Sequence, residues 1–215
     1  MKFTFKTEIL PILLIIFSIG LGFYFYSVSP DQVPMHWNAY GEIDRYGSKL
    51  EGSTMGPAIL LGLYLLFLVI PLLDPKKEKY EQFIGVYKMF RLMIMLLLFA
   101  IFTIASLSGI GYDIKVGIWI PFLIGIMFMF MGNYFGKIKP NWFMGIRTPW
   151  TLSSDEVWYK THRLGGKLFM LMGLFFMLTP LWPPKSLVWT LIVPAVVAAL
   201  VPIVYSYIIF NKLKK

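Results

Sequence analysis

Six long uncharged stretches dominate the chain, and the short segments between them carry all of its charges. The stretches cover residues 9–30, 52–73, 92–112, 116–136, 168–184 and 186–211. A helix needs about 20 apolar residues to cross a hydrocarbon layer of about 30 Å. The pattern therefore predicts an all-α polytopic membrane protein with six transmembrane helices.

Basic residues are divided unevenly among the segments that separate these stretches. The N-terminus, residues 74–91, residues 137–167 and the C-terminal tail together hold 16 of the 20 Lys and Arg side chains. Cytoplasmic segments of membrane proteins are the Lys- and Arg-rich ones. We therefore expect both termini in the cytoplasm, one large outer loop at 31–51 and one large inner loop at 132–167.

Composition supports a membrane location and narrows the range of ligands. The chain is 58% hydrophobic, with a mean hydropathy of +0.70 and a net charge of +9. Because the positive charge lies mostly on one side, it suits contact with anionic membrane lipid, and we expect no direct binding of nucleic acid. The sequence contains no cysteine, which excludes disulfides and thiolate metal sites. We expect no cofactor.

The predicted spans have no Asp, Glu, Lys, Arg or His near their middle. Charged groups inside a membrane usually mark ion pathways or proton relays, so their absence argues against an ion channel or a proton-coupled pump. The connection at 74–91 alternates in charge sign and is expected to be a solvated cytoplasmic turn. Specific chemistry is therefore expected in the two large loops.

The outer loop has the pattern of a small extended cap. Val33, Met35 and Trp37 alternate as in a strand, and residues 38–41 are turn-like. This predicts a compact extended or hairpin-like cap on the outer helix ends. The candidate binding residues of this loop are His36, Trp37, Asn38, Glu42, Asp44 and Lys49.

The outer candidates have three interpretations. His36, Glu42 and Asp44 could be metal ligands, because imidazole and carboxylate groups suit zinc or similar ions. In the second, Asp44, Arg45 and Lys49 form ion pairs that fix the loop. In the third, aromatic residues with mixed charges form a surface that meets an extracellular peptide.

The inner loop is expected to lead into a helix. Ser153 and Glu156 have the spacing of a capping box, which predicts a helix start at Ser153. We expect this helix to lie in the membrane interface and to bend at Gly165 and Gly166 into the span at 168–184.

Aromatic and polar residues are dense in the inner loop. The candidates are Asn133, Asn141, Trp142, Arg147, Thr148, Trp150, Glu156, Trp158, His162 and Arg163. They suit either interfacial anchoring and helix packing or a pocket at the cytoplasmic surface. In such a pocket Arg147 could hold a carboxylate or phosphate, and His162 could titrate near neutrality. No nucleophile–base pair is identifiable from the spacing, so we assign no catalytic residue.

Two segments resemble a known family, the SDP-toxin immunity proteins usually called SdpI. The inner segment is the longer and more specific, and it includes Pro140-Asn141-Trp142-Phe143-Met144-Gly145-Ile146-Arg147-Thr148-Pro149-Trp150-Thr151-Leu152, Glu156-Val157-Trp158 and Thr161-His162-Arg163-Leu164-Gly165-Gly166. The outer segment, Pro34-Met35-His36-Trp37-Asn38 with Gly41-Glu42-Ile43-Asp44, is similar to an N-terminal domain of undefined function that often precedes it. The resemblance covers nearly the whole chain.

The resemblance implies a multi-pass protein of the bacterial plasma membrane. The best-studied member protects its cell from a secreted peptide toxin and relays the toxin's presence by drawing a transcriptional repressor to the membrane. We therefore expect an immunity protein that gives resistance to such a toxin, with a cytoplasmic repressor as a further partner. The alternative is a membrane enzyme or lipid-handling protein whose inner-loop site would join Asn141, Arg147, Glu156 and His162. The expected parts are residues 1–112 with the outer cap and residues 113–215 with the inner motif.

Overall fold

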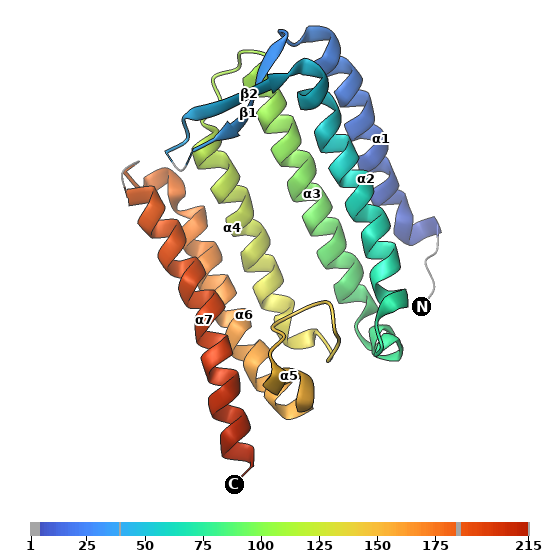
Figure 1. Ribbon diagram of the computed structural model, residues 1–215, viewed down its shortest axis with the longest axis vertical. Helices are drawn as coiled ribbons and strands as arrows, with labels where there is room; N and C mark the ends of the chain where they lie inside the picture. Colours follow the sequence, from blue (N-terminus) through green and yellow to red (C-terminus); the bar gives the residue numbers. More distant parts are fainter. Residues whose placement is uncertain (1–4, 39, 184–185, 215) are drawn as a thin grey trace.

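The computed structural model describes residues 5–38, 40–183 and 186–214, and it shows a bundle of long helices with a small hairpin at one end (Figure 1). The long helices are α1 (Phe5–Val28), α2 (Lys49–Leu73), α3 (Ile84–Gly109), α4 (Val116–Tyr134), α6 (Asp155–Met177) and α7 (Leu187–Leu213). Shorter helical turns are η1 (Lys77–Gln82), η2 (Phe135–Lys137), α5 (Pro149–Ser153) and η3 (Thr179–Leu181). The predicted all-α architecture is confirmed.

Within the described residues, five helices, α1, α2, α3, α4 and α7, are long and apolar enough to cross a membrane. The remaining long helix, α6, begins at Asp155 and carries Lys160, Arg163 and Lys167 before its apolar C-terminal part. Because these charges lower its hydropathy, α6 does not meet the same criterion. The count of six crossings stays a prediction.

The expected interfacial helix and the predicted fifth span form a single helix. α6 runs without interruption from Asp155 to Met177, so the helix continues through Gly165 and Gly166, where a bend was expected. The capping residue is also one position later than predicted, because the Ser154 hydroxyl accepts a bond from the Val157 N–H at 3.4 Å. Residue 184, the predicted end of the fifth span, lies outside the described residues.

The helices form two groups of three. α1, α2 and α3 pack together around Ile15, Leu60 and Met95, whereas α6 packs on both α4 and α7. α3 and α4 are neighbours and connect the two groups, as the short connection between them predicts. The termini and α5 lie at one end of the bundle and the hairpin at the other (Figure 1). The two loops with candidate residues are therefore far apart.

Glycines let α4 and α6 approach closely at two levels. A Cβ atom on Gly132 would lie 2.6 Å from the carbonyl oxygen of Gly166, and one on Gly125 would lie 2.6 Å from that of Gly173. The glycines of each helix are two turns apart and share one face. Gly166 therefore serves close helix packing.

The outer loop forms the predicted hairpin-like cap. Strands β1 (Gln32–Trp37) and β2 (Ile43–Ser48) pair antiparallel, with the register Gln32↔Ser48. Gly41 makes the turn with a positive φ of 81°, a conformation that L side chains rarely adopt. Its backbone lies against Gly117, at the start of α4, so the tip of the hairpin touches the second helix group.

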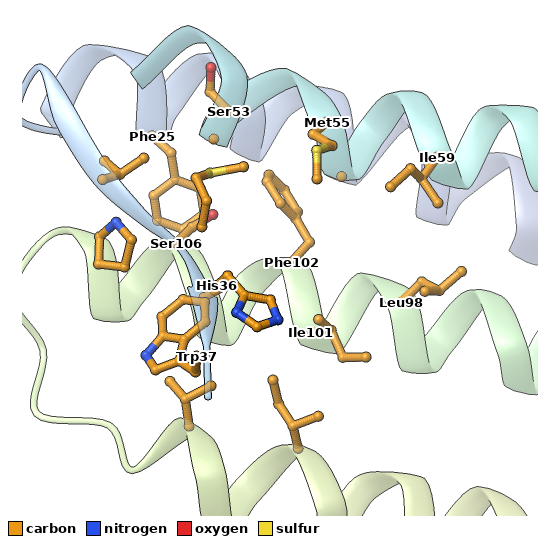
Figure 2. A pocket seen from close by; sticks show the side chains of 18 of the residues that line it. Phe25, His36, Trp37, Ser53, Met55, Ile59, Leu98, Ile101, Phe102 and Ser106 are labelled. Carbon is orange, nitrogen blue, oxygen red and sulfur yellow. The ribbon is translucent and has the colours of Figure 1, made fainter. Parts of the chain in front are cut away.

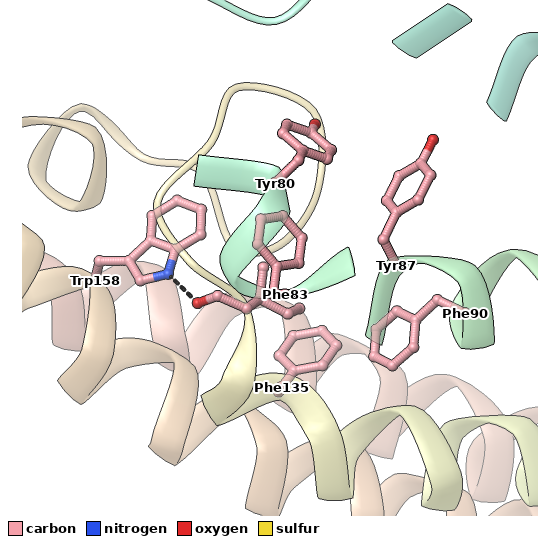
Figure 3. Close-up of a cluster of buried hydrophobic side chains, with 7 residues drawn as sticks. Tyr80, Phe83, Tyr87, Phe90, Phe135 and Trp158 are labelled. Carbon is pink, nitrogen blue, oxygen red and sulfur yellow. Dashed lines mark hydrogen bonds between the residues drawn. The ribbon is translucent and has the colours of Figure 1, made fainter. Parts of the chain in front are cut away.

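The inner end holds an aromatic core that joins both helix groups (Figure 3). Its buried members are Tyr80, Phe83, Tyr87, Phe90, Phe135, Ile138 and Trp158. The first four come from η1, α3 and the residue between them, and the others come from the inner loop and α6. The connection at 74–91 is therefore partly a core element, and its expected description as a solvated turn is wrong.

A buried ion pair connects α1 and α3 near this end. Arg91 Nη2 lies 2.8 Å from Glu8 Oε2, and both side chains are almost fully buried. The Tyr64 hydroxyl of α2 donates to the same carboxylate oxygen at 3.2 Å, which brings all three helices to one point. Glu8 and Arg91 both lie just outside the spans predicted from the sequence. In the structure Arg91 lies two turns inside α3.

Candidate functional site

The inner loop is fixed by a buried carboxylate from the preceding helix group. Asp74, only 2% exposed, follows α2 directly. One of its oxygens accepts bonds from the Tyr80 hydroxyl and from the Trp142 N–H, both at 2.9 Å, and the other accepts from the Lys76 N–H at 2.7 Å. Asp74 thereby holds η1 and the inner loop together.

Asn141 shapes the loop from within. Its side chain is fully buried, and its oxygen accepts from the N–H groups of Phe143 at 2.9 Å and Met144 at 2.6 Å. Its amide nitrogen donates to the carbonyl oxygens of Lys139 and Met144 at 2.9 and 3.0 Å. These bonds use both polar atoms of the side chain, so Asn141 is a structural element of the loop.

His162 and Trp158 connect the loop to α6. The Trp158 indole N–H donates to the carbonyl of Ile138 at 2.9 Å (Figure 3), and its ring stacks on His162 with centroids 4.0 Å apart. His162 Nδ1 lies 2.8 Å from the Trp158 carbonyl oxygen, and Nε2 accepts from the Ile146 N–H at 2.9 Å. These partners require a neutral ring that carries its proton on Nδ1.

Burial shifts the protonation of two groups in this region. Removal from water lowers the pKa of His162 to about 4, although its bond to the Trp158 carbonyl opposes the shift. Burial also raises the pKa of the Tyr80 hydroxyl, and its bond to Asp74 adds to the increase. His162 is therefore neutral at pH 7, and the expected titration near neutrality is wrong for the folded protein.

A hydroxyl cluster connects the loop to α7. The Thr148 and Ser206 hydroxyl oxygens lie 3.0 Å apart, and all three hydroxyl residues of the cluster, including Thr151, are buried. Thr148 caps α5 by accepting from the Thr151 N–H at 3.1 Å, and the Thr151 hydroxyl donates to the Ile146 carbonyl at 2.9 Å. The loop therefore has a second attachment, to the C-terminal helix.

The other inner candidates lie toward the surface. Trp142, Arg147, Asn133, Glu156 and Arg163 are exposed, and Trp150 packs its ring against Tyr207 of α7. Arg147 donates to the Trp142 carbonyl at 2.7 Å, and Glu156 pairs with Lys160 at 2.7 Å. The four residues of the alternative enzyme site are therefore divided: Asn141 and His162 are buried and bonded to the loop backbone, whereas Arg147 and Glu156 face solvent.

The polar residues of the outer hairpin pair with near neighbours. His36 Nδ1 lies 2.6 Å from Asp44 Oδ1, and the Asn38 amide donates to Glu42 at 3.0 Å. Lys49 pairs with Asp31 at 3.0 Å. Among the residues that the structure describes, no group of three or more His, Asp or Glu side chains is placed to hold a metal ion. Of the three interpretations of these residues, the geometry favours loop-fixing pairs over metal ligands.

A cavity of about 420 Å³ lies beneath the hairpin, between α2, α3 and α4 (Figure 2). Its deep wall is apolar and includes Ile59, Leu98 and Phe102. Polar atoms gather at its outer rim, where it is lined by His36, Asn38 and Lys49. Four of the six outer candidates therefore border one cavity, namely His36, Trp37, Asn38 and Lys49. The other two, Glu42 and Asp44, do not line it.

Comparison with known proteins relates two segments of the chain to known families. Residues 137–206 match the SdpI/YfhL protein family, and residues 13–61 match a domain of unknown function (DUF1648). The chain is 24% identical over 208 residues to the immunity protein SdpI of Bacillus subtilis (strain 168). This alignment covers 97% of the present chain and 98% of the relative. No solved structure matches the chain.

The SdpI resemblance drawn from the two loop motifs is thereby confirmed, and the chain is a multi-pass bacterial membrane protein. The SdpI segment includes every inner candidate except Asn133. It ends at Ser206, the α7 partner of Thr148. The DUF1648 match ends in α2, so it contains α1 beyond its first two turns and all of the hairpin.

Sequence reasoning missed several residues that build the inner site. Asp74 and Tyr80 lie outside the SdpI segment, and their charged neighbours gave the connection a solvated appearance. Thr151 and Ser206 were also missed. The sequence does contain a signal for Asp74. This residue directly follows an apolar span, and Tyr80, its hydrogen-bond donor in the structure, lies only six residues later.

We predict that Asp74→Ala destabilises the protein by about 3 kcal/mol, because it leaves the buried Tyr80 hydroxyl and the Trp142 N–H without their acceptor. Thermal unfolding in detergent, followed by tryptophan fluorescence, measures the change. Exposed Glu78 gives a matched control in the same connection, and Glu78→Ala should change stability by less than about 0.5 kcal/mol. Equal effects of the two substitutions would contradict the role of Asp74.

We also predict acid sensitivity through His162. Because its pKa is lowered from 6.5 to about 4 in the folded protein, its contribution to stability is complete above about pH 6.5 and is lost as the pH falls toward 4. Protonation of Nε2 removes the acceptor of the Ile146 N–H. Melting temperatures measured across this range should fall more steeply for the native protein than for His162→Gln; parallel curves would contradict the prediction.

Proposed function

We propose that this protein protects its cell from a secreted peptide toxin that acts on the membrane. The observation that carries the proposal is the similarity to the immunity protein SdpI, which extends along 97% of this chain. Two further features support it: the helices are apolar along most of their length, and structured loops close both ends of the bundle. A protein of this form can meet a membrane-active peptide from outside and within the bilayer.

The proposal includes an orientation. The basic residues of the inner loop and the tails suit the cytoplasmic side, which supports an outer position for the hairpin and its cavity. A toxin arriving from the exterior would then first meet the hairpin. The inner loop, at the opposite end of the bundle, would face the cytoplasm (Figure 1).

Expression of this chain in a strain that is sensitive to the SDP toxin tests the function. We predict increased survival compared with a strain that carries an empty vector, because the expressed protein blocks the toxin at the membrane. Survival is measured as colony counts over a series of toxin concentrations. A protein present in the membrane fraction at normal amounts that gives no protection would overturn the proposal.

The proposal has a finer part, a relay to a cytoplasmic repressor protein. Trp142 and Phe143 are 47% and 39% exposed at the inner end, beside the exposed guanidinium of Arg147. Exposed aromatic residues near an arginine suit a protein interface. The hydrogen bond from the Trp142 N–H to Asp74 fixes the backbone of this surface. We propose that the repressor binds there.

We predict that the double variant Trp142→Ala, Phe143→Ala no longer draws the repressor to the membrane but still protects against the toxin. The measurement follows a fluorescent copy of the repressor that the best-studied family member recruits, together with survival in the same cells. Val193→Ala, at an exposed apolar position of α7, is the control and should retain recruitment. Normal recruitment by the double variant would contradict the relay surface.

A further inference from the structure

The cavity beneath the hairpin extends from the outer end of the bundle into its membrane part. Its lining on α2 begins at Lys49 and continues to Ile59. The step of ten residues from Lys49 to Ile59 corresponds to about 15 Å of helix, or roughly half of the hydrocarbon layer. The cavity therefore offers an apolar path from the membrane surface to about the middle of the bilayer.

The wall on α2 is partly open. Met55 and Ile59 line the cavity, yet they remain 39% and 43% exposed. Figure 2 shows both side chains on the α2 side of the space, with Phe102 and Ile101 projecting from α3. The α2 side of the cavity therefore presents accessible apolar side chains to a ligand.

The hairpin above the cavity has an excess of negative charge. Residues 31–51 carry the carboxylates of Asp31, Glu42, Asp44 and Glu51 against the cations of Arg45 and Lys49. The Glu42 side chain is bonded to the neutral Asn38 amide. Asp31 and Glu51 pair with Lys49 and Arg45. Glu42 and Asp44 instead contact the cavity-lining Asn38 and His36, so these two carboxylates would attract a cationic peptide end and repel an anionic lipid headgroup.

We propose that the cavity between α2, α3 and α4 binds an apolar peptide segment that enters from the bilayer and carries a cationic end at the hairpin. The inference rests on the proposed function, since the toxin is the peptide concerned, and it assigns the binding site and the chemistry of the ligand. The apolar segment lies against Ile59, Leu98 and Phe102, and its basic end lies beside the hairpin carboxylates.

Photo-crosslinking in lipid vesicles tests the site separately from any effect on survival. A photoreactive amino acid replaces Met55 in the cavity wall or, as a control, Leu96, a 42% exposed residue of α3 that does not line the cavity. The probes are two synthetic helices of about 20 Leu and Ala residues, one flanked by Lys and the other by Glu. We expect the Lys-flanked helix to crosslink at position 55 roughly tenfold more than the Glu-flanked helix, and more than at position 96.

A cavity-filling substitution provides the second arm. Ala105 lines the cavity from α3, and Ala105→Phe should lower the crosslinking at position 55 by roughly tenfold, whereas Leu96→Phe on the same helix should leave it unchanged. Ile59→Trp adds bulk at the open wall and should also lower crosslinking, which keeps the test valid if Ala105→Phe fails to fold.

Three results would overturn the inference. They are equal crosslinking at positions 55 and 96, equal crosslinking of the two probe helices, and crosslinking at position 55 to the vesicle phospholipid with none to either peptide. The last result would make the cavity a lipid site. Because the assay uses purified protein and defined peptides, it can fail while the survival test succeeds, and the reverse also holds.

Discussion

The attachment of the inner loop to the bundle determines the shape of the end of the bundle opposite the hairpin. Between η2 and α5 the chain forms no regular helix or strand, so its N–H and C=O groups need other partners. Asn141 supplies several of these hydrogen-bond partners from inside the loop. Asp74, which lies 68 residues before Trp142 in the sequence, supplies the acceptor for the Trp142 N–H. A carboxylate accepts several hydrogen bonds and donates none, which suits it to hold N–H and hydroxyl donors together. The motif of one helix group thus depends on a carboxylate from the other.

The two helix groups meet in three places along the bundle. At the inner end the Asp74 network and the aromatic core join them, in the middle α3 packs on α4, and at the outer end the hairpin tip rests on the start of α4. The close contact of Gly41 with Gly117 leaves no space for side chains at this outer junction. The cavity lies just below it, where α2 and α4 are separated. Its size is therefore set by the contacts at the hairpin and along α3.

Most of the fold followed from patterns local to the sequence, and the corrections involve contacts between distant residues. Hydropathy located the long helices, and the alternation that begins at Val33 located the hairpin. The charges before residue 168 concealed the continuity of α6, because membrane-span criteria treat an amphipathic inner half as a separate element. Asp74 and Arg91 appeared to be ordinary charges at the ends of spans, since their partners Trp142 and Glu8 are 68 and 83 residues away in sequence. Composition carries no signal for such pairs.

The polar candidates of the two loops differ in how readily they can change partners. Asn141 and His162 are buried, and a ligand that took over their bonds would leave backbone groups unpaired in an apolar environment, at a cost of about 1–3 kcal/mol for each group. His36 and Lys49 at the outer end form exposed pairs, which contribute little to stability because water replaces either partner. The inner motif is therefore suited to present a fixed surface. The polar residues at the rim of the cavity beneath the hairpin can exchange their partners at a lower cost. The two ends of the bundle therefore differ in how readily their polar side chains can adapt to a ligand.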